Sequence, residues 1–123
     1  MSLVNWTYGN DSDVFSGSFH SLFIGTPINS AIDLVFLNTT SLSCYKYMFS
    51  KCDKLISAPE LPATTLADYC YYAMFSGCPS LQAAPALPST RLAGHCYENM
   101  FEGCTSLTQA PELPATTLAD SCY

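Results

Sequence analysis

The chain is built from repeated copies of one 26-residue unit, and this repetition limits the folds open to it more than any other feature. Full units begin at Cys44, Cys70 and Cys96. The first and third units agree at 17 of 26 positions, and the second and third agree at 15 of 26. A repeat of this length predicts a stack of similar coils, in which each coil covers the apolar flank of its neighbour.

The repeat also predicts how the 123 residues are divided. Residues 1–17 are expected to form an N-terminal cap or the tail of an upstream segment, and 18–123 a solenoid. The solenoid contains a degenerate unit at 18–43, full units at 44–69, 70–95 and 96–121, and a truncated unit at 122–123. Because no polar capping repeat closes the array, we expect either further units in a longer protein or end-to-end self-association of this chain.

One half of each unit has an amphipathic pattern. Leu66, Ala67, Cys70, Tyr71, Met74 and Phe75 fall at offsets 0, 1, 4, 5, 8 and 9, which is one half of a helical wheel. This pattern predicts helices at roughly 41–50, 65–76 and 91–102, with another near 13–24.

The other half of each unit carries an Ala-Pro-x-Leu-Pro segment, as at Pro59 and Pro62. Proline fixes φ and holds the preceding residue extended, so this half predicts a very short parallel strand. The expected fold is therefore α/β: a right-handed solenoid of the leucine-rich-repeat type, with one short parallel strand and one helix in each coil.

The string YxxMFxGCxSLxxAPxLPxTxLAxxC resembles the BspA-like leucine-rich repeats of bacterial surface proteins. The resemblance is strong from Cys44 to Tyr123 and weak over 18–43, and the chain departs from the pattern at Lys51 and at Asp53-Lys54. It implies an exported protein displayed outside the cell or on its surface, with adhesion to host matrix proteins as a role of some relatives. The start of the chain has no signal peptide, which by itself would indicate the cytoplasm. Because the chain stops inside a unit at Cys122-Tyr123, we expect instead a fragment of a longer protein.

Charge and hydropathy exclude several classes of partner. The net charge is −6, and the chain has only four Lys and Arg residues. Without a basic cluster to neutralise phosphates, binding to nucleic acid is disfavoured. No apolar stretch is long enough to cross a bilayer, so we expect no membrane insertion by this segment.

The seven cysteines recur with the repeat rather than in the close pairs that zinc sites favour. We expect buried thiols that pack as small hydrophobic groups, and neither a metal nor a cofactor. The histidines are His20 and His95, and no base, nucleophile and orienting group cluster outside the repeat frame. The sequence therefore predicts no catalytic residue and no enzyme.

Positions that vary between units indicate a recognition surface, since the framework repeats while these positions do not. Glu60 and Glu112 could form an acidic strip for a cation or a basic ligand, although solvation is the simpler interpretation. We predict binding of a protein or glycan partner, with a structural spacer in a larger surface protein as the alternative. The candidate contact residues are Ile56, Glu60, Gln82, Ala86, Thr108 and Glu112 on the strand half, and Tyr47, Tyr69 and Tyr72 on the outward face of the expected helices.

Overall fold

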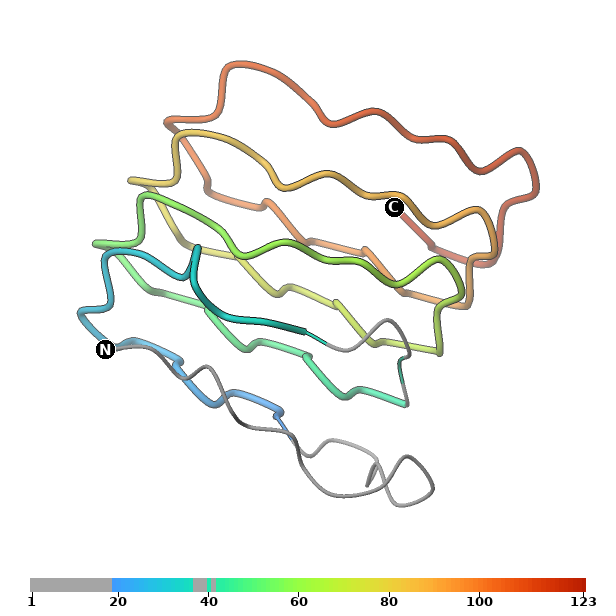
Figure 1. The fold of residues 1–123 in the computed structure, drawn as a ribbon, viewed down its shortest axis with the longest axis horizontal. Coiled ribbons are helices and arrows are strands. Elements are labelled where there is room, and N and C mark those ends of the chain that lie inside the picture. The colour runs from blue at the N-terminus through green and yellow to red at the C-terminus, as the bar shows by residue number, and fades with distance from the viewer. Residues whose placement is uncertain (1–18, 37–39, 41) are drawn as a thin grey trace.

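Similar coils lie one above another in the computed structural model, which describes residues 19–36, 40 and 42–123 (Figure 1). Each coil has two arms. We name the first the turn arm, at 19–25, 42–51, 68–77 and 94–103. The second is the proline arm, at 55–65, 81–91 and 107–117 in the three later coils. The cap or tail expected at 1–17 lies outside the described residues.

The predicted α/β leucine-rich-repeat solenoid is wrong, because the described residues contain no α-helix. The segments 41–50, 65–76 and 91–102 are expected to be helical. They instead form turns over 42–50, 68–76 and 94–102, with a bend at 96–97, whereas 65–67 and 91–93 are not turns. The helix expected near 13–24 falls on described residues only from 19 onward, where the chain also forms turns.

Backbone hydrogen bonds in the turn arms alternate between two directions. In the first three turn arms, every second N–H donates to a carbonyl in the next coil, and most of the N–H groups between them donate to the carbonyl three positions earlier in their own coil. In the fourth turn arm, His95 and Tyr97 make the coil-to-coil bonds. In the second coil, the N–H groups of Tyr45, Tyr47 and Phe49 donate to the next coil at 2.9–3.0 Å; their acceptors are the carbonyls of Cys70, Tyr72 and Met74. The N–H groups of Lys46, Met48 and Ser50 donate within the coil at 3.0–3.2 Å, to the carbonyls of Ser43, Tyr45 and Tyr47. Both backbone polar groups of these residues are thereby satisfied without a helix.

The backbone enters the left-handed region at every fourth residue of a turn arm. Among the described residues, those with positive φ are Ser21, Gly25, Ser43, Tyr47, Lys51, Tyr69, Ala73, Gly77, His95, Asn99, Gly103 and Ser121. In the turn closed by Met48 N–H on Tyr45, the third residue is Tyr47 with φ of 57°, the requirement of a type II turn. The next turn lacks this feature, so two kinds of turn alternate and the structure repeats at every fourth position.

Two physical reasons explain why the helix prediction failed. Over a dozen residues, apolar pairs at intervals of four fit a period of 3.6 as well as a period of 4. Packed helices also need about 8–10 Å between axes, whereas backbones joined by hydrogen bonds lie about 4.8 Å apart. Rings at equivalent positions of successive coils stack with centroids only 5.4–5.8 Å apart, as in Phe49–Phe75, so the coils are too close for helices.

The proline arms are extended but scarcely form a sheet. The described residues show two isolated parallel bridges, Ser30–Ser57 and Thr65–Arg91, in place of the short strands predicted. Both lie at the ends of the arms, and the Ala-Pro-x-Leu-Pro segments of the described coils show no coil-to-coil backbone bonds. Proline has no N–H, which interrupts a ladder at these positions.

The core lies between the two arms as columns of equivalent side chains. One column stacks Phe23, Phe49, Phe75 and Phe101, and another stacks Phe19, Tyr45, Tyr71, Tyr97 and Tyr123. Leucines and cysteines fill the space beside them, and Leu55, Leu81 and Cys78 are fully buried. Each coil thus buries its apolar side chains against its neighbours.

Candidate functional site

Three of the candidate contact residues converge on one charged group. Tyr47, Tyr69 and Tyr72 surround the side chain of Lys46, whose Nζ lies 5.4, 5.0 and 5.0 Å from their ring centroids. Tyr47 meets Tyr72 edge-on at 5.4 Å, and Tyr69 tilts toward Tyr72 at 5.6 Å. All four side chains are half-buried. We call these four residues, together with His95, the aromatic cluster.

His95 extends the cluster onto the fourth coil. Its ring stacks on Tyr69 with 4.5 Å between centroids and 7° between planes. Its Nδ1 also pairs with the carboxylate of Glu98, and the two side chains are 34% and 30% exposed. His95 is therefore partly exposed and lies between the ring of Tyr69 and the carboxylate of Glu98.

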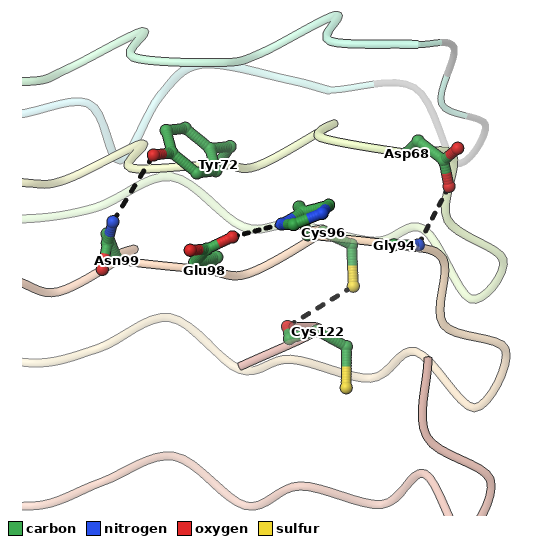
Figure 2. A network of polar contacts seen from close by, with 8 residues as sticks. Asp68, Tyr72, Gly94, Cys96, Glu98, Asn99 and Cys122 are labelled. Carbon is green, nitrogen blue, oxygen red and sulfur yellow. Dashed lines mark hydrogen bonds and ion pairs between the residues drawn. The ribbon is translucent and has the colours of Figure 1, made fainter. Parts of the chain in front are cut away.

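Polar contacts connect this surface from coil to coil (Figure 2). The amide of Asn99 donates to the hydroxyl of Tyr72 at 3.5 Å, and Gly94 N–H donates to the carboxylate of Asp68 at 2.9 Å. On the other side of the cluster, His20 meets Tyr47 edge-on at 5.7 Å. The surface thus spans four successive coils.

The turn arms place these side chains outward at a cost. Tyr47, Tyr69 and His95 all have positive φ, at 57°, 58° and 56°. Bulky residues are uncommon in this region of φ, where glycine costs least. The same conformation recurs at every fourth residue of the turn arms, so the fold sets it and fixes the direction in which these three rings leave the backbone.

Desolvation raises the pKa of the Tyr47 hydroxyl, with the nearby Tyr72 adding to the effect. The phenol therefore stays neutral and the face of the ring keeps its electron density at physiological pH. The cluster thus offers aromatic faces and, at its edge, the carboxylate of Glu98. These features suit a cation, a sugar ring or an aromatic side chain of a partner.

The six candidates on the strand half lie on the exposed side of the proline arms. Gln82, Ala86, Thr108 and Glu112 line an open hollow of about 580 Å³ between the arms of the third and fourth coils. Ile56 and Glu60 are exposed but do not line it. Most of its lining is Ala and Pro, and it has few polar side chains to orient a ligand.

All seven cysteines are buried, as the sequence predicts. Cys52, Cys70, Cys78, Cys96, Cys104 and Cys122 are free thiols. Cys44, Cys70 and Cys96 occupy equivalent positions of successive coils, and no helix separates them. Across residues 19–36, 40 and 42–123, no group of three or more His, Cys, Asp or Glu side chains is placed to hold a metal ion.

Sequence reasoning missed Lys46 and His95 as members of the site. Lys46 and Tyr72 occupy equivalent positions of successive units, and so do Tyr69 and His95. Had the close coil spacing been known, the repeat alone would have placed each pair side by side. The helix interpretation concealed this, because it assumed about 8–10 Å between neighbouring arms.

Comparison with protein-family models, curated proteins and solved structures finds no match. Within the described part of the chain, no helix has the length and apolar character needed to cross a membrane.

Proposed function

We propose that this protein is a non-catalytic recognition module, which binds a protein or glycan partner through the aromatic cluster. The observation that carries the proposal is the convergence of Tyr47, Tyr69 and Tyr72 around Lys46. Half-buried tyrosines on a fixed backbone give a large contact area at low entropic cost, which is typical of recognition surfaces.

The arrangement of rings supports this role beyond simple packing. The core columns already hold Tyr45, Tyr71 and Tyr97, all at most 4% exposed. The aromatic cluster lies outside that core, at positions that differ from coil to coil. A repeat scaffold that holds varied side chains at fixed spacing suits recognition.

We also propose that the module acts outside the cell or on its surface and belongs with the BspA-like surface proteins. The support for this is the repeat string itself, from Cys44 to Tyr123. Adhesion to host matrix is the corresponding role.

A binding screen tests the proposed function directly. The 123-residue chain is immobilised and tested against a glycan array and purified matrix proteins. Tyr69→Leu and Tyr72→Leu are expected to weaken capture of any ligand roughly 5- to 150-fold, because each removes a ring face worth about 1–3 kcal/mol at an interface. Asp53→Asn is the control, because Asp53 is exposed and lies outside the candidate contact residues, and it should leave capture unchanged. Capture that is equal for all variants contradicts the proposal.

A structural spacer is the second candidate, favoured by the uninterrupted stacking of equivalent rings from Phe23 to Phe101. A spacer requires stiffness but no exposed tyrosine cluster. It predicts that the leucine variants change no binding property of the chain.

A further inference from the structure

The aromatic cluster already holds a cation, which shows what its geometry accepts. Lys46 Nζ is within 5.4 Å of three ring centroids, and a cation over a tyrosine face is attracted to within about 6 Å. Recognition of methylated ammonium groups by proteins uses aromatic residues grouped in this way. The rings come from two coils, so the fold itself sets the spacing between them.

The bound ammonium can be displaced. The one ion pair among the described residues joins His95 to Glu98, so no carboxylate pairs with the ammonium group of Lys46 there. The ammonium lies at the end of a flexible four-carbon chain and is strongly hydrated when it leaves the rings. Rotation of the Lys46 side chain into water would leave the three ring faces open, without a change in the backbone.

We propose that the aromatic cluster binds ligands that carry a quaternary or methylated ammonium group, and that Lys46 occupies the site until such a ligand displaces it. The inference rests on the proposed recognition function and names the ligand class of that same surface. A methylated ammonium is larger and less hydrated than the lysine ammonium, so it gives up less hydration on entering the cluster.

The surrounding charge favours a cation. The chain carries a net charge of −6, and Glu98 and Asp68 lie on the same surface as the rings. Anionic groups attract a positive ligand and repel a negative one. Lys46 opposes this attraction while it is in place, so its removal should strengthen binding.

Choline chloride is the probe, and the upfield shift of its methyl resonance in NMR reports contact with ring faces. Lys46→Met is expected to raise the affinity for choline on the order of tenfold, because it removes a competing cation and one positive charge. Lys54→Met is the matched control: it removes the same charge from an exposed lysine outside the cluster and should change affinity little.

A second set of variants tests the rings in the Lys46→Met background. Tyr69→Phe keeps a ring face and should retain choline binding, whereas Tyr69→Leu should abolish it. Neohexyl alcohol, the uncharged carbon isostere of choline, should bind much more weakly, because it lacks the charge that the rings attract.

Absence of a choline shift in folded Lys46→Met protein, in a titration extended to high millimolar concentration, overturns the inference. Equal binding of choline and neohexyl alcohol also overturns it. Neither result removes the proposed recognition function, because the same tyrosines could still bind an uncharged glycan in the array. Conversely, if choline binds but the glycan array and the matrix proteins show no capture, the cation site is supported and the proposed protein or glycan partner is not.

Discussion

The thiol of Cys78 donates a hydrogen bond to the backbone carbonyl of Phe49 in the preceding coil, with 3.0 Å between sulfur and oxygen. The same bond joins Cys52 to Phe23 at 3.0 Å and Cys104 to Phe75 at 3.1 Å. This row of cysteines therefore links successive coils as donors as well as filling the core. The role explains why a thiol, and not alanine, recurs at this position.

Alkaline pH should destabilise the fold. Burial raises the pKa of Cys78 from an ordinary 9.0 to about 12, and burial also raises that of Cys70. Between these values the unfolded chain has lost protons that the folded chain retains, so the free energy of unfolding falls as pH rises. Below pH 9 both states keep these protons and the two thiols contribute no pH dependence. Thermal unfolding followed by circular dichroism from pH 7 to 11 measures the effect.

Cys78→Ala should reduce the steepness of this alkaline loss, because it removes one of the groups responsible. It should also lower stability at neutral pH by about 1 kcal/mol, since the bond to Phe49 is lost.

In the folded protein at pH 7 the buried thiols should react with Ellman's reagent only at the rate of unfolding. Rapid reaction in the native state would contradict the burial of these groups.

Lys51→Gly should stabilise the protein by about 1 kcal/mol, because glycine relieves the steric cost that a side chain meets in the left-handed region. Lys51 has φ of 59°, and its equivalents Gly77 and Gly103 are glycines with φ of 74° and 72°. Lys54→Gly is the control, because Lys54 lacks positive φ, and it should be neutral or destabilising. If Lys51→Gly and Lys54→Gly change the melting temperature equally, the left-handed backbone conformation of Lys51 would be contradicted.

Tyr71→Phe should leave stability unchanged or raise it by about 1 kcal/mol. The Tyr71 hydroxyl is buried with no hydrogen-bond partner, and the same column already contains Phe19. Removing an unsatisfied buried hydroxyl removes its desolvation cost while the ring still stacks. Tyr123→Phe, at a side chain 42% exposed, is the neutral control. A clear loss of stability in Tyr71→Phe would show that the hydroxyl has a partner in solution.

The 123-residue chain should self-associate through its last coil. Leu113 and Leu118 are 49% and 65% exposed in this coil. The described part of the coil also has unused backbone donors. In the third coil the N–H groups of Ala73, Phe75 and Gly77 donate to the next coil, whereas among the described residues the equivalent N–H groups of Asn99, Phe101 and Gly103 show no such bond. Exposed apolar surface and open backbone donors favour association. Leu118→Asp should shift light scattering at high concentration toward the monomer, with exposed Thr90→Asp as the control. A wild-type chain that is monomeric at every concentration would refute the prediction.

The candidate site was partly within reach of the sequence. Variation at positions 47, 69 and 72 indicated exposed tyrosines, and the structure brings all three around one lysine. Lys46 itself could not be found, because its contact depends on the distance between coils, which the sequence does not state. The candidates on the proline arm are exposed, and four of the six line a shallow hollow, whereas Ile56 and Glu60 stand apart from it.

The period of the repeat by itself determined which residues lie against one another, because identical units bury their apolar side chains best when equivalent positions stack. It also determined that Tyr71 and Cys78 are buried. Only the tertiary structure decided the backbone conformation between them. A helix and a chain of alternating turns place the same residues inside over so short a segment. The chain forms turns because backbone hydrogen bonds from Tyr45 and Phe49 to the next coil hold neighbouring backbones too close together for helices.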